Sequence, residues 1–321
     1  MTMSLRIAVQ MDPLESVNID ADSSFALMLE GQRRGHSLVE YHPDALTYDR
    51  GSVRALVRPV TVQRKAGDHA QFEDARTIVL GAESDVVLMR QDPPFDMNYI
   101  AATHLLESIH GVGDNQTFCV NHPGHVRNAP EKIFVTEFAE FMPPTMISRN
   151  VGDITAFRDE YRDIIVKPLF GNGGAGVFHL KPDDENLTSL LETLLQGSRE
   201  QLMVQAYLPA IRAGDKRIIL VDGEPIGAIN RIPAKGEARA NLHVGGRAEP
   251  VTLTARERDI CAALGPVLKQ RDLIFVGIDV IGDSLTEINV TSPTGLQELQ
   301  RFDGTDGPAL IWDAIERRFG E

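Results

Sequence analysis

The stretch Leu273–Pro293, LIFVGIDVIGDSLTEINVTSP, decides the fold of this chain. Its first half is rich in Ile, Val and Phe, which predicts a buried strand. Residues 282–284, GDS, have turn chemistry, and Leu285–Val290 predicts a returning strand. The stretch therefore predicts a β-hairpin with three oxygen-donor side chains: Asp279, Glu287 and Asn289.

The spacing of these side chains decides whether they meet. Residues two apart on a strand face the same way, so Glu287 and Asn289 project together. A three-residue loop or a bulge would place Asp279 on that same face, whereas a plain two-residue loop would place it on the other. Three oxygens on one face suit Mg²⁺, which is usually held jointly with substrate phosphates. A solvated polar face at the sheet edge is the alternative, and the short E-x-N pattern does not decide between them.

Bulk properties restrict the class of protein. A chain of 321 residues suits two or three packed subdomains, and 42% hydrophobic with 24% charged residues is typical of soluble globular proteins. Acidic residues outnumber basic ones by 46 to 32, which disfavours nucleic-acid binding but allows nucleotide binding. Cys119 and Cys261 lack metal-type spacing and are predicted to be buried thiols of a cytoplasmic protein. No apolar run predicts a membrane span or a signal peptide.

The N-terminal part predicts an α/β unit. Leu5–Met11 and Ser37–Tyr41 are apolar strands that flank a helix capped by Asp22 or Ser23, and this order predicts a βαβ unit with a parallel sheet. Asp12, Ser23 and Ser24 would lie near the carboxyl edge of the strands, where open α/β sheets bind ligands. The alternative is that Asp22 and Ser23 act only as helix caps.

A stiff loop follows a second buried strand of this unit. Asp85–Met89 predicts the strand, and it runs into RQDPPFD at 90–96, where two prolines fix the backbone. Such a loop either carries ligand contacts, here through Arg90, or is a plain rigid turn. Segment 53–63 predicts an irregular hairpin arm, and Thr117–Asn121 predicts the closing strand.

The central part contains a glycine-rich loop between two predicted strands. A helix is predicted over Pro130–Phe141 with Lys132 in its first turn, and a strand over Ile164–Lys167 precedes FGNGGAG at 170–176. The loop matches neither the Walker nor the G-x-G-x-x-G pattern. Its amides can face phosphate oxygens, so the loop predicts a flexible lid over a nucleotide, with Lys167 as a charge partner. A merely mobile loop is the alternative.

The C-terminal part adds basic residues and two helices. A DG turn at 222–223 predicts a hairpin that carries Arg217 and Arg231 on one sheet. Segment 232–249 is polar and predicted to be a long structureless lid. Helices are predicted over Arg256–Arg271 and Asp306–Phe319. The second helix is expected to pack Leu310, Ile311, Trp312 and Ile315.

The order of these features resembles the ATP-grasp superfamily. Strings between Met11 and Gly295 are similar to bacterial glutathione synthetases, among them DSSFALMLEGQRRGH, LMRQDPPFD, VKPLFGNGGAGV, GEARANLHVGGR and FVGIDVIGDSLTEINVTSPTG. The superfamily parts fit any carboxylate–amine ligase. The N-terminal strings and the loop after Arg231 indicate this family. Phe170 stands where many relatives carry a polar or tyrosyl residue.

The resemblance implies an α/β (α+β) ATP-grasp fold, in which an N-terminal parallel-sheet α/β domain precedes two subdomains that sandwich ATP. The expected parts are 1–122, 123–200 with the glycine-rich lid, and 201–321 with the metal site and a mobile loop at 232–248. The implied reaction joins γ-glutamylcysteine to glycine through an acyl phosphate and releases ADP and phosphate. A cytoplasmic homotetramer is implied, with no nucleic-acid or membrane partner.

The resemblance also implies roles for individual residues. ATP would be held by Lys132, Lys167, Gly171, Asn172, Gly173, Gly174, Gln205, Tyr207, Leu208 and Asp215. Mg²⁺, with Mn²⁺ as an alternative ion, would be held by Asp279, Glu287 and Asn289. Phosphoryl and oxyanion charge would be stabilised by Arg217, Arg231, Arg239 and Asn241. Candidates for γ-glutamylcysteine are Ser23, Ser24 and Arg90, and those for glycine are Ser292, Pro293 and Thr294.

Two other functions remain open on the sequence alone. Another ATP-grasp ligase, such as a D-alanine–D-alanine ligase or a glutamate-adding ligase, would share the metal and phosphate residues. It should lack the loop RIPAKGEARANLHVGGR in this form. A non-catalytic nucleotide-binding protein is the alternative from a different class, although it would have no need of the transition-state arginines.

Overall fold

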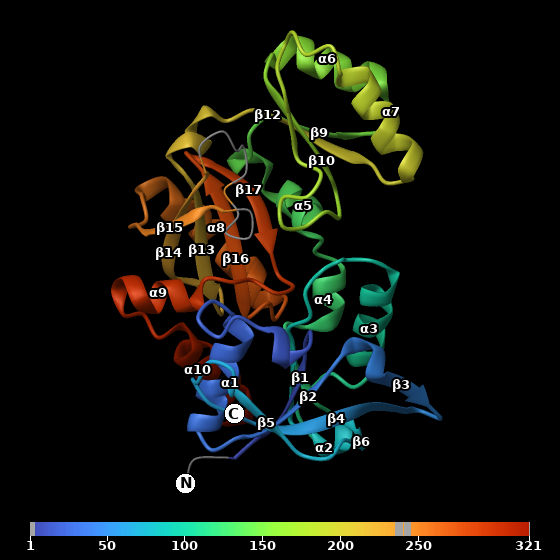
Figure 1. Ribbon diagram of the computed structural model, residues 1–321, viewed down its shortest axis with the longest axis vertical. Coiled ribbons are helices and arrows are strands. Elements are labelled where there is room, and N and C mark those ends of the chain that lie inside the picture. Colours follow the sequence, from blue (N-terminus) through green and yellow to red (C-terminus); the bar gives the residue numbers. More distant parts are fainter. Residues whose placement is uncertain (1–3, 235–239, 241–244, 321) are drawn as a thin grey trace.

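The computed structural model describes residues 4–234, 240 and 245–320. These residues form three sheets (Figure 1). In that view the N-terminal sheet lies at the bottom, the central sheet at the upper right, and the C-terminal sheet to the left between them. Each sheet is built from a separate stretch of the chain.

The N-terminal sheet has a parallel centre, as expected. Strand β1 (Arg6–Gln10) pairs in parallel with β2 (Ser37–Tyr41) and β7 (Val86–Met89), and β7 pairs in parallel with β8 (Phe118–Val120). Helix α1 (Ser23–Arg33) crosses between β1 and β2, and its first turn is capped by Asp22, whose side chain accepts from the Phe25 amide. The predicted βαβ unit is confirmed.

The predicted irregular arm at 53–63 is in fact a long strand, β4 (Ser52–Val62). It pairs antiparallel with β2 and also with β3 (Leu46–Asp49), β5 (Ala70–Phe72) and β6 (Arg76–Val79). The tight turn at Arg50-Gly51 explains the antiparallel pairing of β3 with β4, because both residues have positive φ and reverse the chain at once. The whole sheet of eight strands is therefore mixed.

Short helices complete the N-terminal unit. They are η1 (Leu14–Ser16), η2 (Pro43–Ala45), α2 (Leu80–Glu83), α3 (Met97–Glu107) and α4 (Pro123–Arg127). Asp96 caps α3 by accepting from the amides of Asn98 and Tyr99. This cap fixes the chain directly after the stiff loop at 90–96, so the loop is anchored at both ends by regular structure.

The central sheet is antiparallel, in the order β11-β10-β12-β9. Its strands are β9 (Thr145–Ser148), β10 (Ile164–Pro168), β11 (Phe178–Leu180) and β12 (Leu202–Ala206). Helices α6 (Val151–Tyr161) and α7 (Leu187–Gly197) cover one of its faces (Figure 1). Because β12 pairs with β10 and β9, this sheet extends past residue 200, where the sequence analysis ended the central part.

The predicted helix at 130–141 is broken. Only Glu131–Phe134 is α-helical (α5), and Val135–Phe141 continues as the 3₁₀ segment η3. Phe138 has φ −122° and ψ 45°, which is not helical. Phe134 and Phe138 are both buried in the main core, so tertiary packing outweighs helical propensity here.

The C-terminal sheet runs in the order β15-β14-β13-β16-β17. Its strands are β13 (Asp215–Val221), β14 (Glu224–Ile232), β15 (Arg247–Pro250), β16 (Phe275–Ile281) and β17 (Ser284–Asn289), with η4 (Pro209–Ala213) before them and α8 (Ala255–Gln270) within their order. Strand β15 corrects the prediction of a structureless segment up to 249, since it pairs with β14 from Ile229 to Ile232. The sequence of β15, RAEP, has no apolar alternation, so a strand could not be predicted there from sequence alone.

Two helices end the chain. Helix α9 (Leu296–Asp303) was not predicted, and α10 (Gly307–Gly320) was. In α10, Ile311, Trp312 and Ile315 are buried as expected, but Leu310 is 40% exposed. The Trp312 indole donates to the Leu27 carbonyl at 2.8 Å, which fastens α10 to α1. None of the helices within the described ranges is long and apolar enough to cross a membrane.

Candidate active site

A cavity of about 830 Å³ opens where the three sheets meet. Its walls come from the ends of β1 and β7, from the central sheet with the glycine-rich loop, and from the C-terminal sheet. Of the 21 described residues given a role from sequence, 20 line it; the exception is Ser23. Arg239 and Asn241 lie outside the described residues, so their roles stay predictions.

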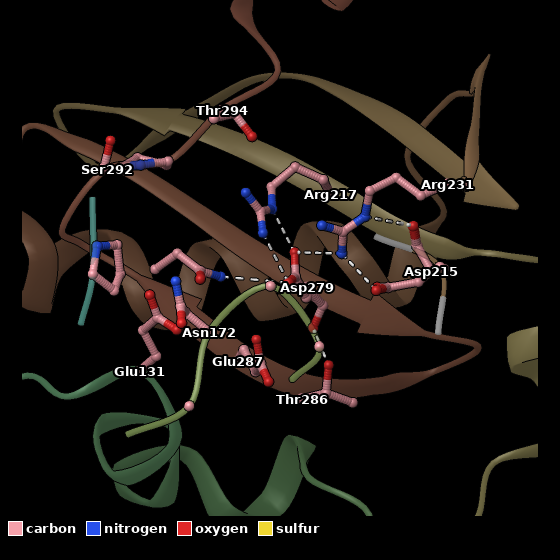
Figure 2. A pocket seen from close by; sticks show the side chains of 18 of the residues that line it. Glu131, Asn172, Asp215, Arg217, Arg231, Asp279, Thr286, Glu287, Ser292 and Thr294 are labelled. Atoms are coloured by element: carbon pink, nitrogen blue, oxygen red, sulfur yellow. Dashed lines mark hydrogen bonds and ion pairs between the residues drawn. The ribbon is translucent and has the colours of Figure 1, made fainter. Parts of the chain in front are cut away.

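The β16–β17 hairpin brings its three oxygen-donor side chains to one face. Its turn is the shorter, two-residue type, since Ile281 pairs with Ser284. A bulge then shifts the register by one residue, so that Asp279 lies opposite Glu287 and Gly277 opposite Asn289. The extra residue is Thr286, whose hydroxyl donates to the Asp279 carbonyl at 3.1 Å. The bulge therefore provides the common face that the metal prediction requires (Figure 2).

Asp279 is the centre of a buried ion-pair network. Arg217 donates to it through Nε at 2.5 Å and Nη2 at 2.9 Å, and Arg231 Nη2 lies 3.0 Å from Oδ1. Burial alone would raise the pKa of this carboxyl group, but the two guanidinium groups outweigh burial and hold the pKa below its ordinary value. Asp279 is therefore a fixed anion that orients two arginines toward the cavity (Figure 2).

Glu287 forms comparable ion pairs with Lys132 and Lys167. Lys167 Nζ lies 3.3 Å from Glu287 Oε1, and Lys132 Nζ lies 3.6 Å from the same oxygen. Burial raises the pKa of Glu287, but the lysine charges outweigh that effect and lower it. The lysines differ: burial lowers the pKa of Lys167, whereas for Lys132 the charges of Glu287 and Glu131 outweigh burial and raise it.

The donor set fits a hard divalent cation that also binds phosphate. Asp279, Glu287 and Asn289 supply carboxylate and amide oxygens on one strand face. The described residues contain no group of three His, Cys, Asp or Glu side chains that could hold a metal ion. Additional oxygens would therefore have to come from a ligand, which is how Mg²⁺ is commonly held beside nucleotide phosphates.

Two more buried carboxyl groups line the cavity. Glu131 precedes Lys132 on α5, and burial together with the charge of Glu287 raises its pKa to about 7. Asp215 accepts from Arg231 Nη2 at 2.5 Å, yet burial outweighs this contact and raises its pKa to about 7. Asp215 Oδ1 is buried and has no hydrogen-bond partner among the described residues, so a ligand hydroxyl could satisfy it.

The glycine-rich loop joins β10 to β11 beside the two lysines. Gly173 and Gly176 have φ of +59° and +70°, which residues with a Cβ rarely adopt. Lys132 Nζ donates to the Gly171 carbonyl at 2.6 Å, and the Phe170 ring stacks on Phe95 with centroids 6.3 Å apart. The base of the loop is thus attached to α5 and to the stiff N-terminal loop.

The strand end of β12 forms the opposite end of the cavity. Gln205, Tyr207 and Leu208 line it there. The Tyr207 ring stacks on His179 with centroids 4.0 Å apart, and His179 Nε2 lies 3.2 Å from Asp163. Sequence reasoning missed His179, because only the β10–β11 pairing brings it to this position.

The N-terminal unit closes the cavity with Arg90. Its Nε donates to Ser24 Oγ at 3.0 Å and its Nη2 donates to the Pro293 carbonyl at 2.9 Å. Ser292 Oγ donates to the Arg90 carbonyl at 3.3 Å. These contacts connect the residues predicted to bind γ-glutamylcysteine, on the N-terminal unit, with those predicted to bind glycine, on the C-terminal unit. Ser23 lies elsewhere, since its hydroxyl accepts from the Leu296 amide at the start of α9.

Several further cavity residues were given no binding or catalytic role from sequence. They are chiefly acidic or hydroxyl side chains: Asp12, Asp22, Asp92, Glu131, Thr291 and Glu298. Asp12 was expected at the ligand-binding edge of the sheet, and the same signal applies to Asp92, because each follows a predicted strand there. Glu298 lies on α9, which the sequence analysis did not predict.

A glycine-rich loop that joins two antiparallel strands, and that faces a second antiparallel sheet across a cavity, is the arrangement of the ATP-grasp class. Residues 5–127 match the family "Prokaryotic glutathione synthetase, N-terminal domain", and residues 131–304 match "Prokaryotic glutathione synthetase, ATP-grasp domain". The chain belongs to the prokaryotic glutathione synthetase family. The resemblance predicted from sequence is confirmed.

Individual relatives agree with this assignment. The chain is 58% identical to the glutathione synthetase of Mesorhizobium japonicum over 98% of this chain and 99% of that protein. It is 57% identical to that of Brucella melitensis, over 98% of this chain and 100% of that one. Among solved structures, D-cycloserine synthetase DcsG has a TM-score of 0.67 at 16% identity, covering 97% of this chain and 99% of that chain. The last likeness concerns the fold alone.

Proposed function

We propose that this chain catalyses the ATP-dependent ligation of γ-glutamylcysteine and glycine to glutathione, with release of ADP and phosphate. Family membership over both parts of the chain supports this reaction over that of another ATP-grasp ligase. The observation that carries the proposal is the shared strand face of Asp279, Glu287 and Asn289, which lies beside two lysines in a cavity closed by the N-terminal unit.

The reaction needs an activated carboxylate, because a free carboxylate is a poor acylating agent. Phosphorylation by ATP converts one carboxylate oxygen into a leaving group. The glycine amine then attacks the acyl phosphate, and phosphate departs. The protein has to hold the carboxylate in line with the γ-phosphoryl group and exclude water from the intermediate.

The side chains of the cavity suit these tasks. Lys132 and Lys167 would hold the nucleotide phosphates, and amides of the loop from Gly171 to Gly174 would cover them. Mg²⁺, or Mn²⁺ in its place, would be held by Asp279, Glu287 and Asn289 and would neutralise phosphate charge. Asp215 Oδ1 would accept a hydrogen bond from the nucleotide ribose, a contact its buried, unpartnered state supports.

The arginines would stabilise charge that develops during transfer. Arg217 uses Nε and Nη2 for Asp279, and no described group accepts from its Nη1. This nitrogen would donate to the transferring phosphoryl group or to the tetrahedral oxyanion, and Arg231, Arg239 and Asn241 would share this role. Loss of one such donor typically costs on the order of 3 kcal/mol in the barrier.

The substrates would meet at the boundary between the N-terminal and C-terminal units. Arg90 and Ser24 would contact γ-glutamylcysteine, and Ser292, Pro293 and Thr294 would position glycine. The direct hydrogen bonds between Arg90 and both Ser24 and Pro293 support this arrangement, because they place the two groups of residues side by side. The reaction needs no covalent nucleophile from the protein, and no general base is assigned.

The direct test combines a ligation assay with one substitution. Purified protein, ATP and Mg²⁺ are incubated with γ-glutamylcysteine and glycine, and glutathione is detected by mass while phosphate release is measured. Parallel reactions contain D-alanine alone. Glutathione should form only in the first reaction, and Glu287→Ala should abolish turnover while thermal unfolding shows an intact fold. Phosphate release with D-alanine alone, or nucleotide binding without any product, would overturn the proposal.

We also propose that the protein acts as a cytoplasmic homotetramer, as the family resemblance implies. Two buried, unpaired cysteines, Cys119 and Cys261, are compatible with a reducing compartment. Sedimentation velocity of the purified protein tests the assembly. A single species at the mass of one chain, across micromolar concentrations, would exclude the tetramer.

A further inference from the structure

Gln205 takes part in a short hydrogen-bond relay at the β12 end of the cavity. Its Nε2 donates to Thr145 Oγ1 at 3.0 Å, and Thr145 Oγ1 donates to the Pro143 carbonyl at 2.8 Å. Gln205 and Thr145 are paired neighbours on β12 and β9. Gln205 is only 4% exposed, so the orientation of its amide is fixed by these few contacts.

The direction of the relay follows from the proton count of its members. A carbonyl only accepts, and a threonine hydroxyl has a single proton. When Thr145 donates that proton to Pro143, its oxygen can only accept from Gln205. The Gln205 NH₂ group must then face Thr145, which turns Oε1 the other way. A flipped amide would take the hydroxyl proton from Pro143 and leave that carbonyl without its donor.

Gln205 Oε1 is an acceptor presented to the cavity. Gln205 lines the cavity, and no donor among the described residues forms a hydrogen bond to its Oε1. This oxygen is nevertheless not one of the wholly buried atoms that lack a partner, so it is exposed to the cavity. A ligand group that approaches this end of the cavity therefore meets a carbonyl oxygen rather than an amino group.

Strand β10 indicates which part of a nucleotide lies there. Ile165 and Lys167 are two residues apart, so they face the same way about 7 Å apart, and both line the cavity. Lys167 lies at the charged end beside Glu287, whereas Ile165 pairs with Gln205. Leu208 and Ile211, which follow Gln205 in the chain, add further apolar side chains to the cavity lining. A flat apolar base fits beside Ile165 when phosphates lie beside Lys167.

We propose that Thr145 is a positioning residue that sets the nucleobase selectivity of this site. By holding the Gln205 amide in one orientation, it presents an acceptor to the exocyclic amino group of a 6-aminopurine. A 6-oxopurine would instead oppose its own carbonyl to Gln205 Oε1. This inference rests on the proposed use of ATP and concerns only the choice of base.

The test compares ADP with IDP, whose bases differ at C6 and in protonation at N1. Binding to the full-length protein is measured by titration calorimetry, without the other substrates. Wild-type protein should bind ADP about 10- to 100-fold more tightly than IDP. In Thr145→Val the hydroxyl is replaced by a methyl group of similar size, Gln205 is free to flip, and this ratio should fall about tenfold. Thr145→Ser keeps the hydroxyl and should retain the wild-type ratio.

The outcomes separate this inference from the proposed function. Equal affinity of the wild-type protein for ADP and IDP overturns the inference, whatever the ligation assay gives. A Thr145→Val protein that weakens both nucleotides equally also overturns it, because a purely structural role moves both affinities together. An intact ADP preference without glutathione formation overturns the proposed reaction alone. Binding of neither nucleotide overturns both. Because the wild-type ratio and Thr145→Ser are measured as well, poor folding of the valine variant does not remove the test.

Discussion

The walls of the cavity formed by the C-terminal sheet and by the central sheet are held in different ways. On the C-terminal sheet, Asp279, Arg217 and Arg231 are each less than 10% exposed and are joined by contacts of 2.5 to 3.0 Å. On the central sheet, the loop at 171–176 consists of exposed and half-buried residues. Its base is attached through the Lys132–Gly171 hydrogen bond and the Phe170–Phe95 stack.

The difference matches the two tasks that a ligase of this kind has to perform. Groups that stabilise developing charge work best when their positions are fixed before the reaction, because no energy is then spent on reorienting them. A cover has to open for substrate exchange, and segments that move are drawn from the least stable parts of a fold. A rigid wall and a mobile wall should therefore respond differently to substitution.

The largest effect is expected from Asp279→Asn on the rigid wall. The substitution keeps the shape but leaves two buried guanidinium groups without their shared anion, which typically costs 3–5 kcal/mol. Turnover should fall at least 100-fold, since the arginines lose their orientation. Denaturant unfolding and phosphate release measure the two effects. Asp283→Asn is the matched control, because Asp283 is exposed in the turn of the same hairpin and should behave as wild type.

The same ion pairs predict a pH dependence. Contacts that lower the folded-state pKa of Asp279 stabilise the protein above the unfolded-state pKa of about 4, and this contribution is lost as pH falls through the folded-state pKa. The stability difference between wild type and Asp279→Asn should therefore shrink as pH falls below about 4. A difference that stayed the same or grew below about pH 4 would show that Asp279 is not a stabilised anion.

Local sequence patterns predicted much of this rigid wall. The strands of β13, β14, β16 and β17 follow from apolar runs between clear turns, and the equal facing of Glu287 and Asn289 follows from their spacing. The position of Asp279 was left open between two alternatives. The bulge at Thr286 decides it, and a bulge depends on how two strands settle against each other rather than on either sequence alone.

Contacts between distant segments account for what sequence did not predict. Glu131, His179 and Thr145 reach the cavity or its neighbours through strand pairing and unit packing. Strand β15 depends in the same way on its pairing with β14. Helix α9 depends on the burial of its own Leu296 and Leu299. The turns and the glycine-rich loop were predictable because their conformation depends on local residue types. The distant residues that contact them were not predictable from such local patterns.

An intermediate effect is expected from Phe170→Ala at the base of the mobile wall. The side chain is half-buried against Phe95, so its removal should cost about 2 kcal/mol, less than a fully buried phenylalanine. The base of the loop loses its contact with Phe95, and hydrogen exchange over 170–177 should become faster. The KM for ATP should rise several-fold with little change in kcat.

Phe95→Ala makes this prediction sharper, because Phe95 belongs to the N-terminal unit. If the Phe170–Phe95 stack carries the effect, Phe95→Ala should also speed hydrogen exchange over 170–177. The double variant should then lose less free energy of unfolding than the sum of the losses in the two single variants. Exposed Met97, at the start of α3 in the same region, provides the control through Met97→Ala. Unchanged exchange of the loop in Phe95→Ala would mean that the two walls are independent at this point.

The smallest effect on stability is expected from Gly173→Ala within the loop itself. Its φ of +59° is strained for alanine, but no atom lies within 4 Å of the added Cβ, so the cost should be about 1 kcal/mol and confined to the loop. Global unfolding should barely change, while the KM for ATP rises because the covering conformation is harder to reach. Gly197→Ala is the matched control, since Gly197 also has open space around it but lies at the end of α7 without positive φ. A loss of global stability in Gly173→Ala as large as in Asp279→Asn would contradict the contrast, because it would show that the loop is as firmly built into the fold as the opposite wall.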